Sequence, residues 1–144
     1  MTDGRAWLIT GGMLSAVASA LHLGCIVGGP SWYRFFGAGA KIVRMAERGW
    51  GAVPVTLLIA GVLATWAAFA FSGARLLPHL PLLRPALVAI TSVYLLRGLI
   101  LLPMLAFRPA MVTPFWLWSS AVVLAYGIVH AVGLARSWTL LVTG

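Results

Sequence analysis

The sequence predicts an all-α integral membrane protein with four transmembrane helices in an antiparallel bundle and a short interfacial amphipathic helix between the first two. Of its 144 residues, 62% are hydrophobic and only 8% are charged, whereas soluble domains carry about 25% charged residues. A domain of this size buries only about 68–70% of its unfolded surface, so a soluble fold would expose much of this apolar area to water. Four separate stretches also have the roughly 20 apolar residues that a membrane-spanning helix needs.

The placement of apolar residues, prolines and tryptophans defines the four predicted spans. They cover residues 6–27, 53–71, 85–105 and 114–134. Pro85 and Pro114 suit the first turn of a helix, where the missing N–H costs nothing, and Pro103 is expected to kink or end the third span. Six of the seven tryptophans lie near predicted ends, at the interface that Trp prefers, and only Trp66 lies within a span.

Four spans place both termini on one side of the membrane, here called side A. Side B then holds the connections over residues 28–52 and 106–113. Side A carries four Lys and Arg residues and side B carries five, so the charge bias does not set the orientation. Single and dual insertion both stay open, and residues 1–144 are expected to form one transmembrane domain.

The connection between the first two spans is predicted to contain an interfacial helix over residues 38–49. Lys41, Arg44 and Arg48 share one face of this helix at i, i+3 and i+7, and Ile42 lies on the other side. A helix of this kind lies on the bilayer with its apolar face buried. We expect the three basic residues to contact lipid headgroups, either as plain anchors or as a site that captures an anionic lipid or ligand.

Arg97 is the most informative residue, because it lies inside the third span, about 18 Å along the helix axis at 1.5 Å per residue. Arginine at a helix centre costs about 2.5–3.5 kcal/mol on insertion scales, and such residues usually have partners. Tyr94, one turn away, can stack on the guanidinium. Of the two acidic residues, Asp3 is on side A and Glu47 is on side B. We therefore expect Arg97 to pair with Glu47, to bind an anionic ligand, or to snorkel to side B.

A polar cluster is predicted on side B around Arg97. His22 lies near the side-B end of the first span, at a comparable depth, and Arg34 follows among aromatic residues. The expected ligand-binding residues are Arg97, His22, Tyr94, Glu47 and Arg34. An alternative for His22 is a plain hydrogen bond between helices.

The shortage of acidic residues excludes many catalytic mechanisms, since two carboxylates provide no acid–base pair within the membrane. The single cysteine, Cys25, allows no cysteine pair, and apolar surroundings disfavour its thiolate. His130 lies toward side A, so one haem held by both His22 and His130 is not expected, and His79 with His130 would make a weak metal site. We expect no catalytic residue, no metal and no cofactor, and, without a groove-reading motif, no nucleic-acid partner.

Two segments carry a resemblance to a known group. Residues 32–39 read WYRFFGAG and residues 94–99 read YLLRGL. With the four spans, they resemble small bacterial membrane proteins of the DoxX-like four-helix group. The resemblance implies a bacterial inner-membrane location and a four-helix bundle, and it implies no activity and no functional residues.

The expected function is that of a non-enzymatic membrane protein whose intramembrane polar pocket, centred on Arg97, binds a lipid, a small anionic ligand or a partner subunit. Membrane lipids are the expected partners, together with a homo-oligomer or a partner membrane subunit. One alternative is a small oligomeric transporter or channel for an anionic or amphipathic solute. Another is a membrane enzyme that acts on a lipid or quinone through His22 and Arg97. Cation pumps that use intramembrane carboxylates are disfavoured, because the spans hold none.

Overall fold

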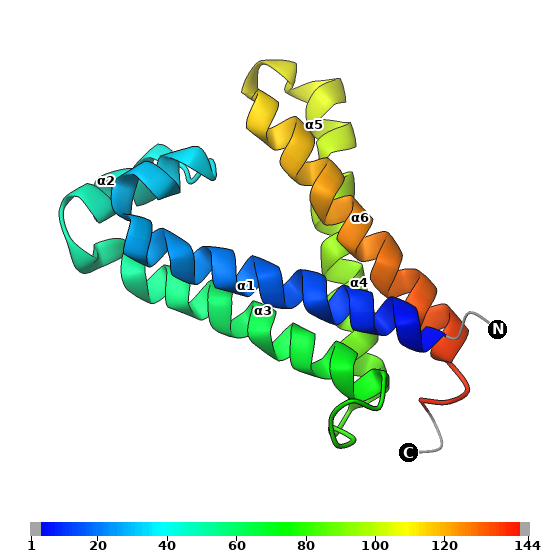
Figure 1. Cartoon of the computed structure of the whole chain (residues 1–144). Helices are drawn as coiled ribbons and strands as arrows, with labels where there is room; N and C mark the ends of the chain where they lie inside the picture. The colour runs from blue at the N-terminus through cyan, green and yellow to red at the C-terminus, as the bar shows by residue number, and fades with distance from the viewer. Residues whose placement is uncertain (1–3, 142–144) are drawn as a thin grey trace. The chain divides into compact units, whose positions relative to one another are not determined.

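The computed structural model describes residues 4–141, which form helices and connecting turns without a strand (Figure 1). The elements are α1 (Gly4–Phe35), α2 (Ala40–Glu47), η1 (Trp50–Ala52), α3 (Val53–Gly73), α4 (Leu83–Leu99), α5 (Leu101–Phe107), η2 (Pro109–Met111) and α6 (Pro114–Ser137). Four helical segments are long and apolar enough to cross a membrane: Gly4–Phe35, Trp50–Gly73, Leu83–Phe107 and Pro114–Ser137. The predicted all-α architecture with four candidate spans is therefore confirmed.

The first helix is longer than predicted, because it continues through a kink instead of ending at residue 27. Gly29 has φ 67° and ψ −158°, and Pro30 follows it. Glycine adopts a positive φ without steric cost, and proline lacks the N–H that would continue the hydrogen-bond ladder. The helix then resumes and ends at Phe35, so much of the predicted connection is helical.

The third span is interrupted beside Pro103, as the sequence predicted. Pro103 has no N–H to donate to the carbonyl of Leu99, four residues earlier. The α-helix accordingly ends at Leu99, and α5 begins at Leu101. Arg97 therefore lies in the last turn of α4, where a cation also interacts favourably with the helix dipole.

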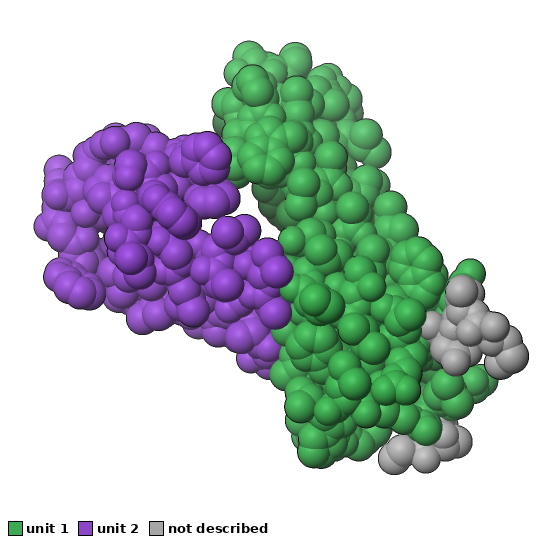
Figure 2. All heavy atoms as spheres, in the orientation of Figure 1, with its two compact units in different colours: residues 1–14, 66–144 green, residues 15–65 purple. Residues whose placement is uncertain are grey.

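The chain divides into two compact units, which Figure 2 shows in different colours. Unit 1 comprises residues 1–14 and 66–144, so it includes α4, α5 and α6 together with the first turns of α1 and the end of α3. Unit 2 comprises residues 15–65 and includes the rest of α1 and α3 together with α2.

In unit 1, glycines allow α4 and α6 to approach each other closely. A Cβ on Gly98 would lie 2.8 Å from the Cα of Leu124, and a Cβ on Gly127 would lie 2.9 Å from the backbone nitrogen of Leu95. Small residues have this effect at helix interfaces in membranes. Gly133 of α6 likewise packs against Leu8 of α1, which is fully buried.

In unit 2, two hydrogen bonds join α1 to α3. The hydroxyl of Ser19 donates to the carbonyl of Ala60 at 2.8 Å, and the hydroxyls of Tyr33 and Thr56 lie 2.7 Å apart. Val43 of α2 is buried in one cluster with Cys25, Tyr33 and Ala52, so it ties the short helix to the end of α1.

Candidate functional site

The guanidinium of Arg97 contacts two side chains of α6. Its Nη1 donates a hydrogen bond to Oγ of Ser120 at 3.2 Å, and its Cζ lies 4.7 Å from the ring centroid of Trp116. Ser120 is buried, whereas Arg97 and Trp116 are partly exposed. A guanidinium at this distance from an indole face gains a cation–π attraction. The aromatic ring against the guanidinium is thus that of Trp116, where the sequence predicted Tyr94.

The Arg97 side chain extends along α6 toward the residue at which that helix begins. The contacts of Gly98 with Leu124 and of Gly127 with Leu95 place the Arg97 backbone level with about residue 125 of α6. Ser120 and Trp116 lie about 7 Å and 13 Å closer to the start of α6, at 1.5 Å per residue. Long basic side chains take this course when they snorkel toward a membrane interface.

Tyr94 lies in an aromatic cluster inside unit 1. Its ring centroid is 4.9 Å from that of Trp66, 5.7 Å from that of Tyr126 and 5.1 Å from that of His130. Tyr94 is buried, and the imidazole of His130 is fully buried. This packing explains why Trp66 lies within a span instead of at its end.

His130 is held by its own helix. Its Nδ1 lies 2.9 Å from the carbonyl oxygen of Tyr126, and a carbonyl can only accept, so the proton is on Nδ1. Nε2 is buried without a hydrogen-bond partner. A Cβ on Gly11 would lie 2.8 Å from Cε1 of this ring, so the glycine makes room for the imidazole.

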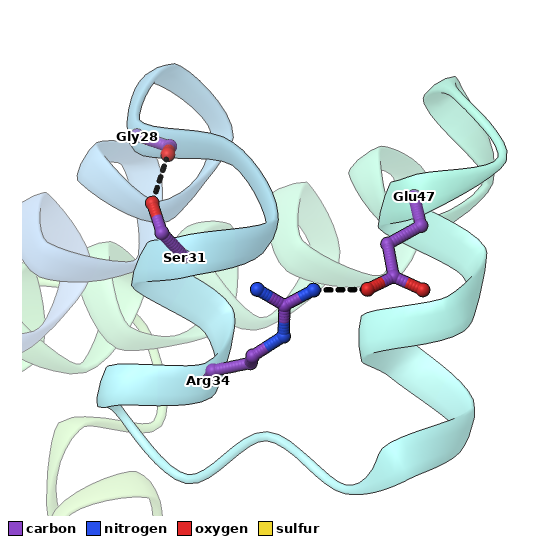
Figure 3. Close-up of polar contacts among 4 residues, drawn as sticks. All are labelled: Gly28, Ser31, Arg34 and Glu47. Carbon is purple, nitrogen blue, oxygen red and sulfur yellow. Dashed lines mark hydrogen bonds and ion pairs between the residues drawn. The ribbon is translucent and has the colours of Figure 1, made fainter.

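Glu47 has a partner other than the expected one. Its carboxylate forms an ion pair with the guanidinium of Arg34, and Figure 3 shows the two side chains pointing toward each other from α2 and from the end of α1. The physical reason is the turn around Gly37, which has φ 69° and reverses the chain, so that the end of α2 faces the end of α1. A pair between Glu47 and Arg97 was one of the three expectations for Arg97, and it is corrected here, because the partner of Glu47 is Arg34. Asp3 lies outside the described residues.

The predicted ligand-binding residues are distributed over both units. Arg97 and Tyr94 belong to unit 1, whereas His22, Arg34 and Glu47 belong to unit 2. Within unit 2 the structure brings Arg34 and Glu47 together.

Lys41 and Arg44 of α2, and Arg48 directly after it, lie away from the buried side of that helix. Lys41, Arg44 and Arg48 are exposed, whereas Val43 is buried and Ile42 is partly buried. Their contact with lipid headgroups stays a prediction.

His22 lines a cavity of about 240 Å³ in unit 2. Its Nδ1 lies 2.8 Å from the carbonyl oxygen of Ala18, one turn earlier on α1. The lining residues are His22, Cys25, Tyr33, Phe36, Gly37, Ala38, Ile42, Val55, Thr56 and Ile59. Sequence reasoning selected His22 from its depth, but it had no means of finding a cavity that residues of α1, α2 and α3 line together.

A second arginine–tryptophan pair was missed by sequence reasoning. The Cζ of Arg84 lies 3.9 Å from the ring centroid of Trp138, beside an open groove of about 540 Å³ lined also by Pro85, Val88 and Ala89. Trp116 and Trp138 are 22 residues apart, or about 33 Å along a helix. This separation matches a hydrocarbon core of about 30 Å, and it is the signal in the sequence by which the two pairs could have been found.

Within residues 4–141, no group of three His, Cys, Asp or Glu side chains is close enough to hold a metal ion. Comparisons of the chain with models of protein families, with curated proteins and with solved structures found no match.

Proposed function

We propose that this protein is an integral protein of the bacterial inner membrane that binds an anionic lipid headgroup or a small anionic ligand at Arg97. One observation carries the proposal. The guanidinium of Arg97 lies in a candidate membrane span and contacts a hydroxyl and an indole, both of which are neutral. Glu47, the sole acidic residue among residues 4–141, contacts Arg34. A cation at this depth is costly without a counter-charge, and a bound anion would supply one.

The geometry of the guanidinium also suits an anion. Its bond to Ser120 uses one of five N–H donors. The remaining donors form a planar fork that matches a carboxylate or phosphate in a bidentate way, and such charge-assisted bonds are about twice as strong as neutral ones. Trp116 contacts the cation. The Arg97 side chain extends toward the start of α6, which in the proposed arrangement is the level at which lipid phosphates lie.

The proposal includes the membrane arrangement. The four spans would form one antiparallel transmembrane domain with both termini on the same side, and α2 would lie in the interface with Lys41, Arg44 and Arg48 toward the headgroups. The exposed Lys41 and Arg44 of α2, the exposed Arg48 that follows it, and the buried Val43 support this placement. The protein would act as a binding protein, with no covalent chemistry of its own.

The proposal is tested by native mass spectrometry of the purified full chain in detergent. We expect phosphatidylglycerol to bind more tightly than phosphatidylcholine, and Arg97→Gln to lower the affinity for phosphatidylglycerol at least tenfold, because a charge-assisted bond is lost. Arg108→Gln, which removes another arginine near the end of α5, is the matched control and should change the affinity less than twofold.

Two further results distinguish the sources of the anion. Competition by inorganic phosphate at millimolar concentration would identify a small-anion site, whereas no competition would identify a lipid headgroup site. The proposal would be overturned if Arg97→Gln bound phosphatidylglycerol and inorganic phosphate as tightly as the wild type does.

A further inference from the structure

We infer that the 240 Å³ cavity of unit 2 binds a small apolar molecule that carries a hydroxyl group and donates its proton as a hydrogen bond. The cavity lies within residues 22–59. The inference rests on these residues alone and stands whether or not Arg97 binds an anion.

The size and lining of the cavity fit one substituted ring. An engineered apolar cavity of about 150 Å³ binds benzene, so a cavity of about 240 Å³ has room for a ring with a short side chain. Aliphatic and aromatic side chains make up most of the lining, among them Phe36, Ile42 and Ile59. Small-molecule sites combine such a lining with a few polar groups that fix the orientation of the ligand. Here the polar groups are those of His22, Tyr33, Thr56 and Cys25.

The proton of His22 is fixed by its own helix. The carbonyl oxygen of Ala18, 2.8 Å from Nδ1, can only accept, so Nδ1 carries the proton. A neutral imidazole has one donor and one acceptor. Nε2 of His22, a residue that lines the cavity, therefore accepts a hydrogen bond and has none to donate.

The protons of Thr56 and Tyr33 are fixed in the same way. The hydroxyl of Thr56 donates to the carbonyl of Ala52 at 2.9 Å, which uses its single proton. The bond of 2.7 Å between Tyr33 and Thr56 must then be donated by Tyr33. Both hydroxyl protons are consumed within the protein, and the oxygen of Tyr33 keeps lone pairs that can accept.

The polar edge of the cavity therefore accepts hydrogen bonds and scarcely donates them. The remaining donor is the thiol of Cys25, which is weak. A ligand with a hydroxyl group satisfies this edge, whereas an ether or a ketone of the same shape brings acceptors against acceptors. None of the ten lining residues is acidic, and the chain has a net charge of +8, so the edge does not favour an ammonium group. The ligand is thus a small phenol or alcohol.

Isothermal titration of the full chain in detergent micelles, with protein-free micelles subtracted, tests this selection. The probes are 4-propylphenol and 4-propylanisole, which differ by methylation of the hydroxyl. We expect the phenol to bind the wild type about tenfold more tightly, because the ether cannot donate to Nε2. In His22→Leu, which leaves Tyr33 as the acceptor, the affinity ratio should fall below that of the wild type while the anisole still binds.

Two controls complete the design. His79→Gln changes an exposed histidine outside the cavity and should keep the ratio of the wild type. Ala38→Leu fills the cavity and should weaken both probes together. Should His22→Leu fail to fold, the ¹⁵N chemical shift of Nε2 in the wild type replaces it, since the phenol should move this signal and the anisole should not. Equal affinities of the two probes for the wild type, or a ratio in His22→Leu as large as that of the wild type, would overturn the inference.

Discussion

Nη1 of Arg97 lies 3.2 Å from Oγ of Ser120, so the cation of α4 is tied to a buried position of α6. This bond and the contact with Trp116 direct the guanidinium toward the start of α6. The charge thereby lies closer to the start of α6 than the backbone of Arg97 does.

The coupling between Arg97 and Ser120 can be measured with a double-mutant cycle of Arg97→Gln and Ser120→Ala. We expect a coupling free energy of about 0.6 kcal/mol, the average for hydrogen bonds between membrane helices. Reversible unfolding in mixed detergent and SDS micelles gives the four stabilities. Ser120→Ala alone should also weaken anion binding, because the guanidinium loses the contact that orients it. Additive effects of the two changes would refute the coupling.

Replacing Gly11 by alanine should destabilise the protein. The added Cβ would lie 2.8–3.0 Å from three atoms of the His130 imidazole, which is fully buried. Overpacking of this kind costs about 1–3 kcal/mol, measured as a lower free energy of unfolding. Gly61→Ala is the matched control, because nothing lies within 4 Å of its Cβ position. That change should cause no loss, and equal losses at both positions would count against tight packing at Gly11.

Gly127→Ala should separate α4 from α6. Its Cβ would meet the backbone nitrogen of Leu95 at 2.9 Å, and a backbone cannot move aside as a side chain can. We expect a loss of at least 1 kcal/mol, together with a weaker bond between Arg97 and Ser120. Reversible unfolding in mixed detergent and SDS micelles measures the loss, and unchanged stability of Gly127→Ala would contradict the prediction.

The ion pair between Arg34 and Glu47 should contribute little stability. The two side chains are 58% and 43% exposed, and ion pairs this exposed to solvent contribute about 0.2–1 kcal/mol. Glu47→Gln should therefore lower the unfolding free energy by less than about 1 kcal/mol, and 1 M salt should remove most of the difference. Anion binding at Arg97 should be unchanged, whereas a large gain in anion affinity in Glu47→Gln would show that Glu47 competes for Arg97.

The contact between Arg84 and Trp138 should depend on the aromatic face. Trp138→Phe should retain part of the cation–π attraction, and Trp138→Leu should lose it, at a cost of about 0.5–1 kcal/mol. Unfolding of the two variants beside Arg84→Gln in the same micelles provides the measurement. The prediction fails if Trp138→Leu costs the same in the presence and absence of Arg84.

Much of the fold follows from the sequence because its causes are local. Hydropathy and length set the four spans, and the absence of an N–H at Pro103 interrupts the third. The extension of α1 to Phe35 did not follow in this way. It depends on the kink at Gly29, and a glycine signals that a positive φ is allowed without showing that it is used.

The sequence predicted which residues belong to the candidate site, and it did not predict which residues they contact. The sequence alone determined that the chain is apolar enough for four spans, that one arginine lies within them and that acids are scarce. The tertiary structure decided that Glu47 meets Arg34 and that Arg97 meets Ser120 and Trp116. The physical reason is that hydropathy depends on composition along one segment. A partner depends on turns and helix contacts that bring distant residues together, and on the few ångströms that a long side chain can reach.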